Sequence, residues 1–197
     1  MSAIKMKYVL YVLMVFSMVG VAGCILTPEV VPPEEKPKPT YKDLTHVEDV
    51  VTNLVQCYKE HNINRYKELL HDQYEWHNQD LDVQSGAVEK EFNTRDEEIA
   101  THTKFFQAAE HQYPDPLKNI DRLELNIADA PWIQIIEFEN EPCEDCWTTT
   151  RIYDITVEFA GGASTLMGND LVLLTVVPIK KNETTYYRLR RADDIKK

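Results

Sequence analysis

The chain has 197 residues, with 33 acidic and 21 basic side chains and a formal net charge of −12. This surplus of carboxylates excludes the basic footprint that nucleic-acid binding requires, so no nucleic-acid partner is expected. It also disfavours adhesion to anionic lipid by charge alone, and it indicates a solvated, acidic surface.

The first 24 residues have the architecture of an export signal. Lys5 and Lys7 precede an apolar run, and small residues then lead to a cysteine in Val21-Ala22-Gly23-Cys24. These last four residues resemble the lipobox of bacterial lipoproteins. The resemblance implies a signal peptide over residues 1–23, cleavage after Gly23, and acyl chains such as palmitate on Cys24. It therefore implies a lipoprotein held in the membrane of the cell envelope, on the extracytoplasmic face.

Two other interpretations of this segment stay open. The stretch from Tyr8 to Leu26 is about long enough for a transmembrane anchor, although Gly20 interrupts it. An ordinary secretory signal, cut near Ala22, is the second alternative. All three interpretations place the folded part outside the cytoplasm. Ile25 stands where an aspartate would signal inner-membrane retention in some Gram-negative bacteria, which slightly favours the outer membrane.

A tether follows the lipidation site over residues 24–40. It contains five prolines among mixed charges, so it cannot form a core and is expected to act as a semi-rigid spacer. Residues 41–197 remain as one domain, which is long enough to bury a substantial core. Without Lys5 and Lys7 the net charge of the mature chain falls to −14.

Three cysteines remain after lipidation, and an export route permits disulfides. Cys143 and Cys146 could close a small ring within a turn, form half of a metal site, or act as a redox pair. No second C-x-x-C exists, and the nearby carboxylates would raise the pKa of each thiol. We therefore favour a local disulfide or unpaired turn cysteines. Cys57 is interpreted as a small buried apolar residue.

The first half of the domain has the period of helices. A capping box at Thr45 and Glu48 begins an amphipathic helix to about His61. A short helix follows from Ile63 to about His71. A second capping box, Thr94 with Glu97, begins a third helix to about His111 with Ile99, Phe106 and Ala109 facing inward.

The second half has the period of strands. The expected strands are a brief one around Tyr74 and Trp76, then 123–127, 132–138, 153–159, 171–179 and 184–191, with a turn at 180–183. Helices followed by consecutive strands joined by turns predict an α+β fold with an antiparallel sheet.

The run Val50–His77, VVTNLVQCYKEHNINRYKELLHDQYEWH, and the closing Tyr186–Ile195, YYRLRRADDI, resemble the NTF2-like superfamily, also called SnoaL-like or cystatin-like. The resemblance covers about Asp43 to Ile195. It implies N-terminal helices packed in the concave face of a curved antiparallel sheet, forming a cone that often holds a pocket. It also implies a homodimer through the sheet as one assembly.

No nucleotide, zinc-protease or hydrolase motif is present, so no catalytic residue and no cofactor is assigned. Candidates for lining a pocket are assigned by position: Tyr74, Trp76, His77, His102, Arg188 and Arg190. No histidine has a carboxylate at a readable offset, which predicts that the domain lacks a proton-transfer dyad. The loop from Asp80 to Glu91 loosely resembles a calcium loop, but it has Ser85 where a glycine is needed, so no metal is expected.

Three functions remain open at this stage. The favoured one is a membrane-anchored, non-enzymatic domain that binds a small ligand or an envelope protein. The second is an enzyme resembling SnoaL or ketosteroid isomerase, which would use the cone for proton transfer or hydration. The third is a structural subunit without a pocket. The interior of the cone would separate them.

Overall fold

The computed structural model describes residues 40–78, 92–114, 118–162 and 165–195. The signal peptide, the lipobox, Cys24 and the tether up to Pro39 lie outside the described residues, so their assignments stay predictions. The loop Asp80–Glu91 also lies outside them. Among the helices described, none is both long enough and apolar enough to cross a bilayer.

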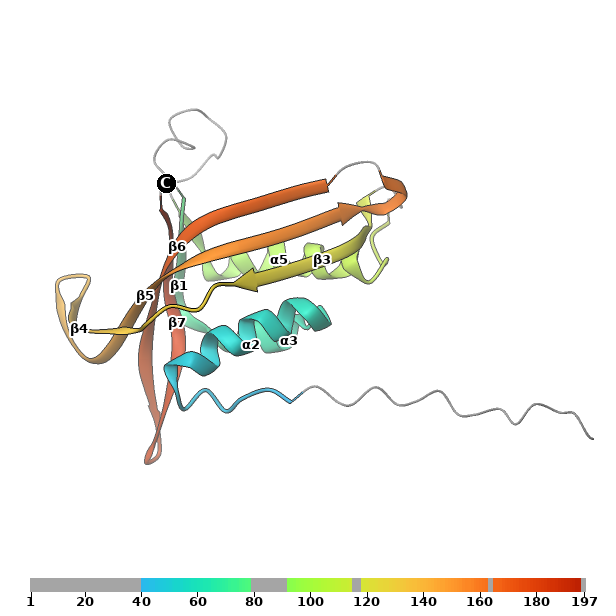
Figure 1. Cartoon of the computed structure of the whole chain (residues 1–197). Helices are drawn as coiled ribbons and strands as arrows, with labels where there is room; N and C mark the ends of the chain where they lie inside the picture. Colours follow the sequence, from blue (N-terminus) through green and yellow to red (C-terminus); the bar gives the residue numbers. More distant parts are fainter. Residues whose placement is uncertain (1–39, 79–91, 115–117, 163–164, 196–197) are drawn as a thin grey trace, which may run out of the picture. The chain divides into compact units, whose positions relative to one another are not determined.

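Within the described residues the chain forms three α-helices and seven strands (Figure 1). In chain order they are α2 (Val47–Glu60), α3 (Ile63–Leu69), β1 (Leu70–His77), β2 (Phe92–Thr94), α5 (Arg95–Ala109), β3 (Ile120–Ile127), β4 (Ile133–Phe138), β5 (Glu141–Phe159), a 3₁₀ turn η2 (Ala160–Gly162), β6 (Thr165–Lys181) and β7 (Thr184–Ile195).

Local capping fixes where the helices begin. The Thr94–Glu97 capping box is confirmed, since the Glu97 carboxylate accepts the Thr94 backbone N–H at 3.1 Å. The capping box expected at Thr45 is wrong by one residue, because the N-cap of α2 is His46. The His46 backbone N–H donates to the Asp49 carboxylate at 3.3 Å. The Asn62 side chain accepts the Arg65 N–H at 3.1 Å and so begins α3.

The strand order in the sheet is β2-β1-β7-β6-β5-β3, with β4 paired to β5. Every pairing is antiparallel except that of β1 with β7, which is parallel. The wholly antiparallel sheet expected from the sequence is corrected at this point. Because β1 and β7 stand far apart in the chain, no hairpin constrains their relative direction, and the last strand inserts between β1 and β6.

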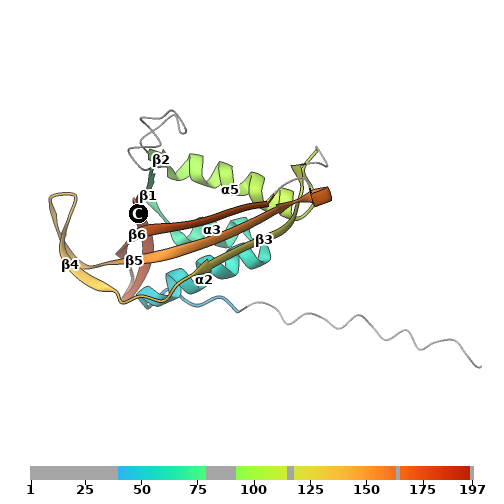
Figure 2. The same cartoon turned by 45° about the horizontal axis from the view of Figure 1, so that its top comes forward.

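The sheet bends strongly, and the three helices lie on its concave side (Figures 1 and 2). A register shift between Thr175 and Val176, where β6 faces β7, contributes to this bend. The predicted α+β class is confirmed, and helices held against a curved, mostly antiparallel sheet are the arrangement that the NTF2-like resemblance implies.

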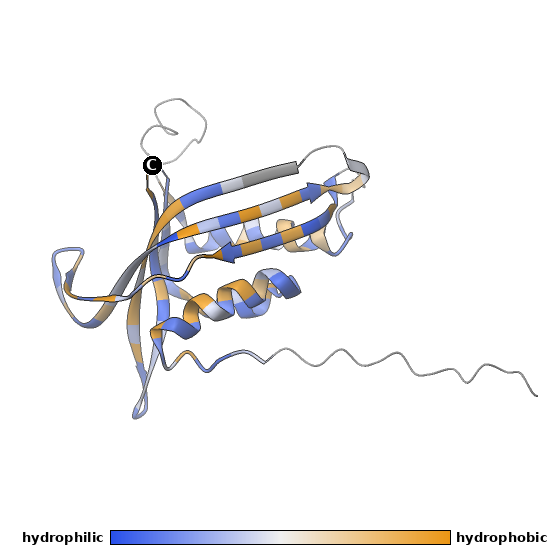
Figure 3. Cartoon of the chain, viewed as in Figure 1, coloured by the Kyte–Doolittle hydropathy of each residue, from blue (hydrophilic) through white to orange (hydrophobic). Residues whose placement is uncertain are grey.

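The core lies between the helices and the concave face. Hydrophobic and hydrophilic residues alternate along β3 and the second half of β5, and α2 turns an apolar stripe inward (Figure 3). The stripe predicted for α2 is confirmed by its buried residues Val47, Val51, Leu54 and Tyr58. On α5, Phe106 is buried as expected, whereas Ile99 and Ala109 are only partly buried.

Strand β5 is longer than the sequence indicated. The strand expected at 153–159 is the second half of an element that begins at Glu141, directly after a turn at Glu139–Asn140. Its first half is rich in polar residues and carries Cys143 and Cys146. This composition does not indicate a strand, so the first half was not predicted. The two cysteines therefore lie in a strand and not in a turn, with Asp145 between them at a φ of 67°.

Candidate functional site

A cavity of about 270 Å³ lies between the helices and the concave face of the sheet. Its walls are mainly apolar and aromatic, as is usual for small-molecule sites. The lining residues are Leu54 and Tyr58 of α2, Tyr66 of α3, Tyr74 and Trp76 of β1, Asn93 of β2, Glu98, His102 and Phe105 of α5, Leu125 of β3, Tyr153 and Ile155 of β5, Asp170, Val172 and Leu174 of β6, and Leu189 and Ala192 of β7.

A hydrogen-bonded network of three helices forms one wall of this cavity. The Tyr58 hydroxyl lies 2.5 Å from His102 Nε2, and His102 Nδ1 lies 3.0 Å from the backbone oxygen of Glu98. A carbonyl oxygen can only accept, so Nδ1 carries the proton and Nε2 accepts from Tyr58. The Tyr66 ring stacks on the imidazole, with centroids 4.2 Å apart. The imidazole is thus held in one orientation and one tautomer.

Glu98 is the carboxylic acid of this network. It is 7% exposed, accepts a hydrogen bond from the Tyr66 hydroxyl at 3.0 Å, and has Oε1 3.5 Å from His102 Nδ1. Burial lowers the pKa of His102, against smaller opposing effects of the Glu98 carboxylate and carbonyl. The imidazole is therefore neutral near pH 7, which suits it to accept a proton.

The phenols in the cavity stay protonated. Burial raises the pKa of Tyr58, Tyr74 and Tyr153, and the Glu98 charge adds to the shift for the first two. The buried Tyr153 hydroxyl has no hydrogen-bond partner within the described residues. A buried hydroxyl without a partner is costly, so this donor is available to an acceptor atom of a bound molecule.

Half of the residues assigned from the sequence line this cavity. Tyr74, Trp76 and His102 line it, as their positions on β1 and α5 suggested. His77 does not, because it points to the other side of β1, where it stacks on Phe92 and bonds Glu75 at 2.9 Å. Arg188 and Arg190 do not line it either. Leu189 and Ala192 are the β7 residues that do, and the register shift between β6 and β7 falls at Arg190.

The expectation that no histidine has a nearby carboxylate is wrong. Glu98 and His102 are four residues apart on α5, a spacing that places two side chains on the same helical face. This spacing was visible in the sequence, because the helix that contains both residues was itself predicted. Tyr58, Tyr66 and Tyr153 were also missed as site residues, since nothing in the sequence shows that three separate elements meet there.

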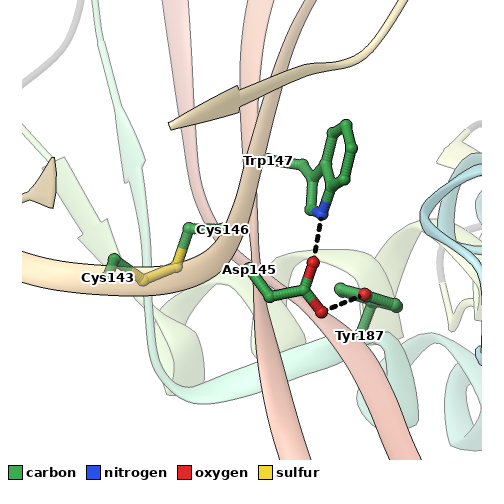
Figure 4. The surroundings of a disulfide bond; sticks show 5 residues. All are labelled: Cys143, Asp145, Cys146, Trp147 and Tyr187. Atoms are coloured by element: carbon green, nitrogen blue, oxygen red, sulfur yellow. Dashed lines mark hydrogen bonds between the residues drawn. A yellow bond between two sulfur atoms is a disulfide. The ribbon is translucent and has the colours of Figure 1, made fainter. Parts of the chain in front are cut away.

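The cysteine pair lies apart from the cavity residues. A disulfide joins Cys143 and Cys146 within β5 (Figure 4). Between them, the Asp145 carboxylate accepts hydrogen bonds from the Trp147 indole N–H at 2.9 Å and from the Tyr187 hydroxyl at 2.5 Å. The short ring therefore holds Asp145 against β7. Cys57 is fully buried, and burial raises the pKa of its thiol to about 12, as fits an unreactive core residue.

No group of three or more metal-ligating side chains occurs among the residues that the structure describes. The calcium-like loop at Asp80–Glu91 lies outside them.

No family model matches the chain, and no curated protein matches it. Among solved structures it is similar to an NTF2-like superfamily protein from Salmonella enterica, with 8% identity, a TM-score of 0.48, and coverage of 75% of this chain and 85% of the other. It is also similar to a protein with a cystatin-like fold from Caulobacter vibrioides, with 14% identity, a TM-score of 0.45, and 75% and 84% coverage. An NTF2-like protein from Cytophaga hutchinsonii matches with 12% identity, a TM-score of 0.41, and 75% and 93% coverage. These likenesses concern the fold and carry nothing about ligand or activity.

The buried imidazole makes stability depend on pH in a defined direction. Because the pKa of His102 is lower in the folded than in the unfolded state, the unfolded state binds more protons below about pH 6.5. The free energy of unfolding should therefore fall as the pH drops below that value. We expect urea titrations of His102→Gln to show a flatter dependence between about pH 5 and pH 7 than the unchanged chain. The exposed His111 gives a matched control, His111→Gln; equal slopes for both variants would contradict the prediction.

Proposed function

We propose that this protein is a lipid-anchored, extracytoplasmic domain that binds a small and largely apolar molecule in its cavity. The cavity itself is the observation that carries the proposal. Its walls of Leu125, Val172 and Leu174 suit an apolar body, and the Tyr153 hydroxyl of β5 is a donor without a partner among the described residues. A ligand with one hydroxyl or carbonyl oxygen matches this chemistry. The cavity also disfavours a purely structural subunit with a filled core.

A neutral fluorescent probe tests ligand binding. N-phenyl-1-naphthylamine brightens in apolar surroundings, and we expect it to bind the full chain saturably at one site. Ala192→Phe, which projects a ring into the cavity from β7, should remove this binding. Val172→Phe provides a second obstruction from β6, in case the first variant fails to fold. Ile136→Ser, at a position that is 86% exposed on β4, should bind the probe normally. Equal binding by all variants would overturn the proposal.

The lipid anchor has its own prediction. Val21-Ala22-Gly23 presents small residues at the cleavage site, so Cys24 should become the acylated N-terminus. We expect Cys24→Ser to remain uncleaved or unlipidated, and intact-mass spectrometry of the two proteins measures this directly. Recovery of a normally processed, membrane-bound form from the variant would contradict the lipobox assignment.

A second candidate function is an enzyme that moves a proton. The Tyr58–His102–Glu98 network favours it, because a neutral imidazole held in one tautomer beside a cavity can act as a general base. For His102 Nε2 to serve, Tyr58 must move aside or relay the proton. Hydrogen exchange of a bound ketone carrying an acidic α-proton, followed by NMR in D₂O, separates this function from simple binding. His102→Gln should abolish the exchange while probe binding persists.

A further inference from the structure

A second pocket, of about 220 Å³, lies among the segment Tyr41–Leu44, helices α2 and α3, and strand β7. It shares no lining residue with the cavity described above. Its lining is polar and charged: Tyr41, Lys42, Asp43 and Leu44, then Asn53 of α2, Arg65, Glu68 and Leu69 of α3, and Tyr186 and Arg188 of β7. The site is therefore built for a different kind of ligand.

Arg188 is exceptional among the arginines of the chain. Each of the others lies within 4 Å of a carboxylate, in the pairs Arg65–Glu68, Arg95–Asp96, Arg122–Glu124, Arg151–Asp129, Arg190–Glu139 and Arg191–Asp193. Within the described residues the half-buried Arg188 side chain has no ion pair and no hydrogen bond, and its Nε atom is buried without a partner. An unpaired cation is unexpected in a chain with 33 carboxylates, because burying one without a counter-charge is costly.

More positive charge surrounds this position. Arg95 donates to the backbone oxygen of Lys67 at the end of α3, and its Nε is also buried without a partner. Burial and the charges of Arg190, Arg188 and Arg95 together lower the pKa of His71. Burial likewise lowers the pKa of Arg188, against the attraction of Glu68 and Asp72. Arg188 and Arg95, each with a buried Nε that has no partner within the described residues, thus act on the same imidazole.

We propose that this pocket binds a phosphate group, with the Arg188 guanidinium as its main ligand. A guanidinium fork matches two phosphate oxygens, and Lys42 and Tyr186, which also line the pocket, carry further donor groups. A tetrahedral phosphate accepts from several sides, whereas a carboxylate accepts within one plane. Glu68 opposes an anion less than its charge suggests, because Arg65 Nη1 already binds it at 2.7 Å. Asp43 is exposed at the rim of the pocket.

Phosphate could reach this pocket from two sources, a lipid head group or a soluble phosphate. Residues 41–44 directly follow the predicted tether, so a head group is within reach if Cys24 is acylated. Only this route for a head group rests on the proposed function. Two water-soluble probes separate the sources. Inorganic phosphate represents the free ion, and glycerophosphoglycerol represents a head-group phosphodiester without acyl chains. Because neither probe requires a membrane, a failure of the lipid anchor does not affect the result.

The experiment titrates the full chain, purified in nonionic detergent, with each probe by calorimetry. The resonance of the Arg188 Nε–H group is followed by NMR in parallel. We expect saturable binding of at least one probe, a shift of that resonance, and at least about tenfold weaker binding in Arg188→Gln, since a charged hydrogen bond is lost. Arg188→Lys, which keeps the charge but not the fork, tests the same point if the first variant is unstable. Arg122→Gln, at a surface arginine paired with Glu124 and Glu158, is the matched control and should bind normally.

The outcomes are distinct. Comparable or tighter binding of the phosphodiester supports a lipid head group, and binding of inorganic phosphate alone supports the free ion. Binding of neither probe, or equal binding by the chain and by both Arg188 variants, overturns the proposal. Loss of N-phenyl-1-naphthylamine binding in the other cavity would not bear on it, because the two sites share no residue.

Discussion

Replacing Phe106 by alanine is expected to lower the free energy of unfolding by about 3–5 kcal/mol, the range for a buried aromatic residue truncated in a core. The ring is 2% exposed, and its centroid lies 5.4 Å from that of Tyr58 and 6.1 Å from that of Tyr66. Its removal would deprive α2, α3 and α5 of their common contact. Urea unfolding followed by far-ultraviolet circular dichroism measures the loss.

The control for this prediction is Ile136→Ala on strand β4. That side chain is 86% exposed, so its truncation should change the free energy of unfolding by no more than about 0.5 kcal/mol. Similar losses for the two variants would show that Phe106 is not part of the core.

Replacing Arg151 by alanine is expected to cost about 3 kcal/mol or more. The side chain is 5% exposed, and its Nη atoms donate to the backbone oxygens of Ala128 at 3.3 Å and Ala130 at 2.7 Å. Hydrogen bonds from a charged donor contribute about 1.5–3 kcal/mol each, and the two carbonyls would lose this partner. The guanidinium also lies 5.4 Å from the centre of the Trp132 ring. Arg151 therefore stabilises the connection between β3 and β4 through hydrogen bonds to its backbone.

Two variants bracket this result. Arg151→Lys keeps a cation but cannot reach two carbonyls with a planar fork, so its loss of stability should approach that of Arg151→Ala. Arg122→Ala removes a surface arginine and should leave the urea midpoint nearly unchanged. If Arg151→Lys has the same urea midpoint as the unchanged chain, the hydrogen bonds to Ala128 and Ala130 do not contribute measurably to the free energy of unfolding.

Local signals in the sequence were sufficient for the helices and for most of the strands. The helix of Val47, Leu54 and Tyr58, and the capping box at Thr94, depend on residues within a few positions of one another, so periodicity and capping rules found them. The first half of β5 was missed because Cys143, Pro142 and the neighbouring polar residues show no clean alternation. Its extended form comes from pairing with β4 and β6.

The site was less predictable than the fold. Tyr74, Trp76 and His102 line the cavity, and they lie on elements that periodicity had assigned. The parallel pairing of β1 with β7 depends on contacts between segments that are far apart in the sequence. A single sequence does not encode such a pairing in any local pattern, so the residues that it brings together could be found only in the structure.

The position of β7 in the sheet has a consequence for folding. This strand, Thr184–Ile195, is the last of the described strands in chain order, yet it is the one that joins β1 to β6. A chain without β7 cannot connect α3 and β1 to the rest of the sheet, so closure of the sheet depends on a pairing between strands that are far apart in the sequence. A truncation that removes β7 would therefore be nearly as damaging to the fold as one that removes the second half of the domain.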